Sequence, residues 1–129
     1  MGAAHVHTAW TRAALPLCLL GIFDTEEKSY GYALLSRLTD VGIDGVKAAT
    51  LYPALTRLEE EGAVEIEWGA GEGGPGRKYY RITDAGRVRL RRDRAAWAAF
   101  ASTVASLTRA DEQDAAPSPA PTGEGEDQA

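Results

Sequence analysis

The sequence predicts a mostly α-helical fold with one β-hairpin, and the order of its hydrophobic patterns is the evidence. Stretches with helical spacing of apolar residues occupy residues 15–23, 32–42 and 48–61. Residues 63–82 then alternate apolar and polar side chains around a glycine-rich centre, and a helical pattern returns at residue 84. Helices followed by a hairpin in this order are typical of a winged helix-turn-helix, here followed by a long C-terminal helix.

The first two predicted helices are short and differ in character. The apolar run of residues 15–23 predicts a buried helix with Pro16 in its first turn, where a missing N–H does least harm. The second helix follows Lys28 and Ser29, keeps its apolar residues at helical spacing and ends near Gly42.

The third predicted helix starts near Ala48 and ends at Gly62, a residue suited to a helix C-cap. Pro53 falls in or near its first turn, where proline is tolerated. Its buried face is predicted to be a leucine stripe with i, i+4, i+7 spacing, formed by Leu51, Leu55 and Leu58.

The hairpin is predicted for residues 63–82. Two alternating stretches flank residues 69–76, which hold five glycines and one proline and form the tip. Because Tyr79 and Tyr80 are neighbours in a strand, they point to opposite faces. We therefore expect one tyrosine in the core and the other exposed.

Four parts follow one another along the chain. We expect a loose N-terminal extension (1–10), a winged helix-turn-helix DNA-binding domain (11–83), a C-terminal dimerisation helix (84–109) capped by Thr83 or Asp84, and a tail (110–129). The tail has six acidic residues, no basic ones and no aliphatic residue larger than alanine, so we expect it to be disordered.

The net charge of −5 conceals an uneven distribution. Residues 77–94 contain eight basic and two acidic residues, a net charge of +6 over 18 residues. A local positive field of this kind attracts polyanions even when the whole chain is acidic. Nucleic acid is therefore a possible partner.

Composition argues against several other classes. The longest apolar run is about half of the ~20 residues that span a bilayer, and Cys18, the single cysteine, fits a reducing cytoplasm and an inert core thiol. The histidines, His5 and His7, lie near a chain terminus and make a poor metal site or catalytic dyad. We expect a cytoplasmic protein without membrane span, metal, cofactor or enzymatic activity.

Polar side chains at the start of the third helix point to double-stranded DNA. Hydroxyl, aromatic and basic groups lie there away from the leucine stripe and suit base edges and phosphates: Lys47, Thr50, Tyr52, Pro53, Thr56 and Arg57. Arg77 and Lys78 follow the hairpin tip, where a wing meets phosphate or the minor groove. A solvated helix face and a charged strand edge that blocks aggregation would explain the same residues without DNA.

The last helix carries a heptad seam, which predicts a homodimer. Its members are Leu90, Trp97, Phe100, Val104 and Leu107. Trp10 and Trp97 would then line an apolar cavity between the subunits that binds an effector. Ordinary core packing is the alternative for both tryptophans.

Several short motifs together carry a resemblance to a known family. They are Gly31-Tyr32, the TLYPAL sequence of residues 50–55, Arg57-Leu58-Glu59, Glu61-Gly62, Gly74-Pro75, the RKYY sequence of residues 77–80, and Thr83 to Gly86. In these motifs and their order the chain resembles the PadR family of bacterial transcriptional regulators, over roughly residues 15–94. Ala48-Ala49 depart from the family, which often has Glu or Ser followed by Gly there.

The resemblance implies a winged helix-turn-helix homodimer, usually a repressor, that binds an inverted repeat and leaves DNA when a small aromatic or drug-like effector binds. Thr50, Tyr52 and Pro53 match the recognition-helix motif, and Arg77 and Lys78 match the wing. Tyr32 matches a tyrosine near the DNA backbone. Trp97 falls where some members place a tryptophan in a drug pocket at the dimer interface.

Two alternatives remain open on the sequence. One is a protein-interaction module that uses the winged-helix scaffold without DNA. The other is a PadR-like regulator whose effector is a cyclic dinucleotide, with guanine edges paired by Arg91, Asp93 and Arg94. A solvated helix face or a contact with the DNA backbone is the favoured explanation of these three charged residues.

Overall fold

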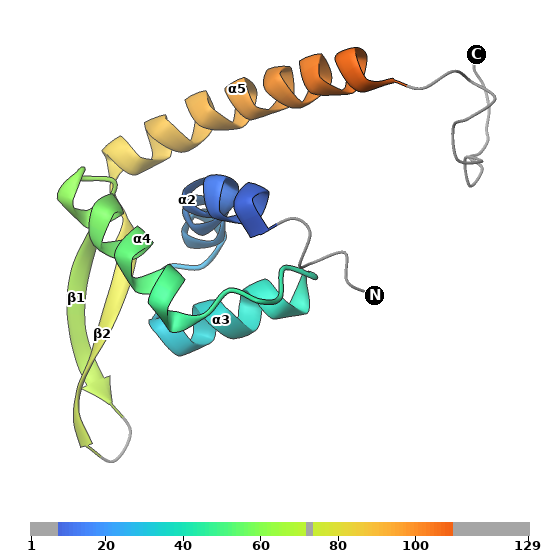
Figure 1. Cartoon of the computed structure of the whole chain (residues 1–129). Coiled ribbons are helices and arrows are strands. Elements are labelled where there is room, and N and C mark those ends of the chain that lie inside the picture. Colours follow the sequence, from blue (N-terminus) through green and yellow to red (C-terminus); the bar gives the residue numbers. More distant parts are fainter. Residues whose placement is uncertain (1–7, 72–73, 110–129) are drawn as a thin grey trace, which may run out of the picture. The chain divides into compact units, whose positions relative to one another are not determined.

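Four helices and a two-stranded antiparallel sheet form the computed structural model, which describes residues 8–71 and 74–109 (Figure 1). In chain order the elements are α2 (Thr8–Thr25), α3 (Gly31–Asp40), α4 (Ala48–Glu60), β1 (Val64–Gly71), β2 (Gly74–Ile82) and α5 (Asp84–Thr108). The predicted fold class is confirmed. The two histidines and the acidic tail lie outside the described residues.

The first helix begins earlier than the sequence predicted. α2 starts at Thr8, so residues 8–10 of the expected loose extension are helical. The alanine-rich stretch before Pro16 favours helix strongly enough to extend it, and Pro16 lies inside the helix instead of in its first turn. Because proline has no backbone N–H, it cannot donate the helical hydrogen bond to the carbonyl of Arg12.

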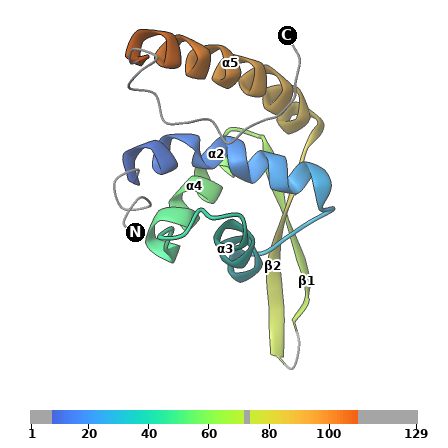
Figure 2. The same ribbon diagram turned by 90° about the vertical axis from the view of Figure 1, so that its right-hand side faces the viewer.

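The chain forms two compact units, residues 1–94 and 95–129, and the hydrophobic core belongs to the first. Both views show α2, α3 and α4 packed together with the hairpin at one edge of the three helices (Figure 1, Figure 2). Each leucine of the predicted stripe of α4 is at most 1% exposed. The largest fully buried side chains are Tyr80, Phe23, Leu15, Leu19, Leu20, Leu34, Leu38, Leu51, Leu55, Leu58 and Val64.

Glycine ends two of the helices, as the sequence predicted. Gly42 follows α3 with φ of 95°, and Gly62 follows α4 with φ of 80°. The next amide in each case donates back across the helix end, from Ile43 to the carbonyl of Leu38 at 2.8 Å and from Ala63 to that of Leu58 at 2.9 Å. These bonds satisfy carbonyls that the helix end would leave open.

The hairpin has two distinct faces because opposed residues share a face. We call the first the core face; its pairs are Val64 with Ile82, Ile66 with Tyr80, and Trp68 with Lys78. The second, the polar face, carries Glu65, Glu67, Arg77, Tyr79 and Arg81. Tyr80 is 2% exposed and Tyr79 is partly exposed, which confirms that the two tyrosines divide between the faces.

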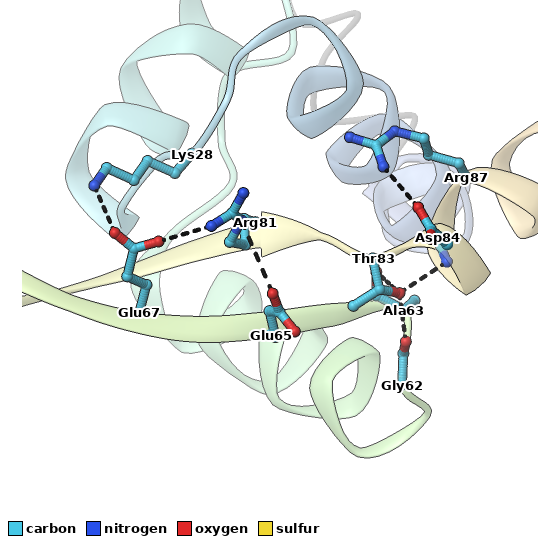
Figure 3. Close-up of polar contacts among 10 residues, drawn as sticks. Lys28, Gly62, Ala63, Glu65, Glu67, Arg81, Thr83, Asp84 and Arg87 are labelled. Atoms are coloured by element: carbon cyan, nitrogen blue, oxygen red, sulfur yellow. Dashed lines mark hydrogen bonds and ion pairs between the residues drawn. The ribbon is translucent and has the colours of Figure 1, made fainter.

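Thr83 joins the hairpin to α5 (Figure 3). Its hydroxyl donates to the carbonyl of Gly62 at 2.7 Å and accepts from the amide of Gly86 at 3.0 Å, which caps the helix. A Cβ at Gly86 would overlap the carbonyl oxygen of Ala63. Glycine is therefore required where α5 begins against the start of β1.

Candidate nucleic-acid interface

The helices α3 and α4, joined by residues 41–47, form the helix-turn-helix of the first unit. While the leucine stripe of α4 faces the core, its other sides face solvent. Tyr52 is 43% exposed, Thr50 is partly exposed, and the remaining candidate side chains of this region are exposed, namely Lys47, Pro53, Thr56 and Arg57. The structure thus presents the predicted side chains at the surface of one helix start.

Tyr52 has a structural task that the sequence did not reveal. A Cβ added to Gly31, the first residue of α3, would overlap the phenol ring and hydroxyl of Tyr52. The ring therefore lies directly on the α3 backbone and fixes the start of α3 against α4. Tyr32, the next residue of α3, is 73% exposed and free to meet a ligand at the same helix start.

The chain before α3 runs alongside the hairpin. Ser29 and Tyr80 form an antiparallel bridge with backbone hydrogen bonds of 3.0 and 2.8 Å. The bridge turns the buried Ser29 toward the core, so that its neighbours Lys28 and Tyr30 lie on the polar face of the hairpin.

Aromatic rings hold the basic side chains of this polar face. The guanidinium of Arg77 lies 4.1 Å from the ring centroid of Tyr30, and the amine of Lys28 lies 4.8 Å from that of Tyr79. The two tyrosine rings meet edge to face, with centroids 5.6 Å apart. Arg77, a predicted wing contact, is therefore positioned on the N-cap residue of α3 by a cation–π interaction.

Glu67 neutralises positive charge on the polar face by pairing with Lys28 and Arg81 (Figure 3). Glu67 accepts from Lys28 at 2.8 Å and from Arg81 at 3.1 Å. The hydrogen bond from Lys28, supported by its charge, lowers the pKa of Glu67, and the same bond raises the pKa of Lys28. The positive charge left for a ligand on the hairpin is therefore that of Arg77 and Lys78.

Trp68 is a candidate that the sequence analysis missed. It lies opposite Lys78 on the core face, beyond the pair formed by Ile66 and Tyr80, and its side chain is 68% exposed. The alternation of apolar and charged residues predicts a buried position for Trp68. Trp68 lies four residues beyond Val64 in β1, and this distance could have indicated that the core ends before it.

The predicted dimer seam divides between the two units. Leu90 was assigned to the interface, but it is 3% exposed and belongs to the core of the first unit, because the first turns of α5 pack on the same domain. The other four seam residues are exposed in the chain: Trp97 by 42%, Phe100 by 61%, Val104 by 40% and Leu107 by 81%.

The residues predicted to bind an effector also belong to both units. Trp10, 64% exposed, belongs to the first unit and Trp97 to the second. Arg91 and Arg94 are exposed, whereas the Asp93 carboxylate already accepts from Arg92 at 3.0 Å and from Arg89 at 3.4 Å. A guanine edge would therefore share the Asp93 carboxylate with two arginines.

Residues 8–71 and 74–109 hold no group of three or more His, Cys, Asp or Glu residues arranged for a metal, and no helix among them is long and apolar enough to cross a membrane. Burial raises the pKa of the half-buried Cys18 thiol, which disfavours the reactive thiolate.

Comparison with known proteins places this arrangement among transcriptional regulators. The profile of the "Transcriptional regulator PadR-like family" matches residues 19–92. An uncharacterised curated protein of Lysinibacillus sphaericus is 36% identical over 67 residues, which are 50% of this chain and 62% of that protein. The chain thus spans less than two thirds of this curated relative.

Solved structures extend the comparison to the fold. A PadR family transcriptional regulator from Eggerthella lenta is 39% identical with a TM-score of 0.71, covering 80% of this chain and 88% of that one. A PadR-like transcriptional regulator from Bacillus cereus is 33% identical with a TM-score of 0.70, covering 81% of this chain and 100% of that one.

Proposed function

Since the chain belongs to the PadR-like family of transcriptional regulators, we propose that it is a sequence-specific DNA-binding repressor that acts as a homodimer on an inverted repeat and is released by a small effector. The observation that carries the proposal is the surface of α4. Its leucine stripe is buried, while Tyr52, Pro53 and Thr56 face solvent beside α3. A helix with one buried apolar face and polar side chains exposed at its start can enter the major groove of DNA and contact base edges there.

The hairpin supplies the second DNA contact. Arg77 and Lys78 meet phosphate or the minor groove, and the Tyr30 ring beneath Arg77 holds its guanidinium in place. Both views show the strands β1 and β2 extending beyond α3 within the first unit (Figure 1, Figure 2). Helix and wing therefore approach the duplex as parts of one compact unit.

The exposed seam of α5 makes the dimer. Trp97, Phe100 and Val104 give their apolar surface to the same residues of a second copy, and a C2 interface of this kind is self-complementary. Two recognition helices then reach half-sites about one turn of DNA apart, ~34 Å. Trp97 is the side chain that we assign to an aromatic effector at this seam.

The first test is fluorescence anisotropy with a labelled duplex from immediately upstream of the protein's own gene, in excess nonspecific competitor. Tight binding that survives the competitor, at two protomers per duplex, is the expected result. If neither this duplex nor fragmented genomic DNA binds in the presence of competitor, the repressor proposal is wrong and the protein-interaction module takes its place.

Variants separate the two contacts. Tyr52→Ala is expected to weaken operator binding by ~1–3 kcal/mol, the size of a lost base-edge contact. Tyr52→Phe keeps the ring on Gly31, so it separates the contribution of the hydroxyl to DNA binding from that of the packing.

Arg77→Ala is expected to weaken binding to all DNA sequences alike. It should also reduce the slope of log affinity against log salt concentration by about one, the value for one lost phosphate contact. A salt slope equal to that of the wild type would remove the wing contact.

A further inference from the structure

A hollow lies between α2 and α4, and no residue of α3 lines it. Its volume is about 360 Å³. The hollow is lined by Arg12, Leu15 and Pro16 from α2 and by Ala49, Thr50, Pro53, Ala54 and Arg57 from α4. All eight residues belong to the first unit, so the hollow lies within one compact unit.

Each helix contributes a proline to the lining of this hollow, Pro16 from α2 and Pro53 from α4. Because proline has no backbone N–H, the carbonyls of Arg12 and Ala49 lack the usual i+4 donor. Both of these residues also line the hollow.

The charge of the lining selects the ligand. Arg12 and Arg57 stand on opposite helices, and among the described residues neither guanidinium pairs with a carboxylate. No acidic side chain lines the hollow, whereas Leu15, Pro16, Pro53 and Ala54 give it aliphatic walls. Arginine binds carboxylates in charge-assisted, often bidentate pairs. Because no aromatic ring lines the hollow, its walls suit the aliphatic part of a ligand.

We infer that this hollow binds a small aliphatic carboxylate, and that the carboxylate and the operator exclude each other. The second part rests on the proposed function, since Thr50, Pro53 and Arg57 are also DNA-contact candidates of α4. A carboxylate bound between Arg12 and Arg57 lowers by one the net positive charge that this surface presents to DNA. By linkage, DNA lowers affinity for the carboxylate by the same factor.

Binding is tested without DNA, by titrating the 15N-labelled full chain with sodium hexanoate at constant ionic strength. Amide shifts that saturate are expected at Leu15, Thr50, Ala54 and Arg57. Hexanol, which lacks the charge, and sodium chloride are expected to leave these amides unmoved. Equal shifts with hexanol or with chloride would overturn the site.

Matched variants locate the charge. Arg12→Gln is expected to weaken hexanoate binding about tenfold, the loss of one hydrogen bond to a charged group. Arg109→Gln makes the same charge change at an exposed residue outside the hollow and is expected to bind as the wild type does. Equal affinity of Arg12→Gln and Arg109→Gln would overturn the assignment.

The DNA arm is separate. Hexanoate is expected to raise the operator Kd of the wild type and to leave that of Arg12→Gln almost unchanged. Hexanoate that binds in the titration without changing the operator Kd would overturn the mutual exclusion alone. Failure of all DNA binding would overturn the proposed function, while the titration would still decide the carboxylate site.

Discussion

Two stretches of α5 carry the same heptad seam in different surroundings. In the first, Leu90 is 3% exposed, Arg87 lies 3.6 Å from Asp24 and Arg89 lies 2.6 Å from Glu61. The second, from Ala95 to Thr108, has no charged residue, and its Leu107 is 81% exposed. One stretch completes the core of its own unit, whereas the other leaves its apolar side chains exposed.

The hairpin repeats this division on its core face. Tyr80 is 2% exposed near the base, and Trp68 is 68% exposed toward the tip, although both lie on one face. A regular apolar stripe therefore shows that a surface will be covered, but not whether the same chain or a ligand covers it. Mutating a buried and an exposed residue of the same stripe distinguishes packing within the chain from contact with a ligand or partner.

The largest effect is expected at Leu90. Leu90→Ala removes a side chain that is buried in the core of its own unit, and a buried Leu→Ala change costs about 2–5 kcal/mol. Urea denaturation followed by circular dichroism measures the loss. Val88→Ala, at a 56% exposed position two residues away, is the control and should change stability little. Equal stability of the two variants would place Leu90 outside the core.

Phe100→Ala should instead weaken the dimer and leave the fold of the first unit intact. Its ring is 61% exposed and lies 6.2 Å from that of Trp97 between centroids. In the proposed dimer this aromatic side chain is buried, and loss of an aromatic hot spot costs about 2 kcal/mol. Sedimentation velocity over a range of concentrations measures the dimer Kd, again against Val88→Ala. An unchanged Kd would show that the second stretch is not the interface.

Trp68→Ala tests the exposed end of the hairpin. If DNA covers the indole, operator affinity should fall by roughly 1 kcal/mol, since part of one apolar side chain loses its contact. Because Trp68 is exposed, the urea midpoint should stay near that of the wild type. Anisotropy and denaturation on one preparation measure both quantities. Lost stability with unchanged DNA affinity would make Trp68 a structural residue.

The sequence predicted most of the fold because its local patterns agree with the tertiary packing. The α4 leucine stripe, the Gly62 end and the Thr83 cap each depend on residues close in sequence. The misassigned features depend on contacts distant in sequence. Neither the packing of Tyr52 on Gly31 nor the burial of Leu90 follows from periodicity, since each needs a second element to be placed first.

The smallest effect distinguishes the charged stretch of α5 from the uncharged one. The hydrogen bond and charge of Arg92, followed by those of Arg89, lower the pKa of Asp93 below its usual 3.8. A lowered carboxyl pKa contributes stability that is complete above the unfolded value and is lost as the pH falls through the folded value. Asp93→Asn should therefore reduce the free energy of unfolding at neutral pH by about 0.2–1 kcal/mol, as for partly exposed ion pairs. The difference from the wild type should shrink below pH 3.8.

Urea titrations between pH 7 and pH ~2.5, a range that brackets the unfolded pKa, measure this difference in the free energy of unfolding. Asp44→Asn, at an exposed position, is the control. Since residues 95–108 carry no charge, the dimer Kd should not follow this pH profile. A dimer Kd that changes together with the Asp93 titration would show that the first stretch also contributes to the interface.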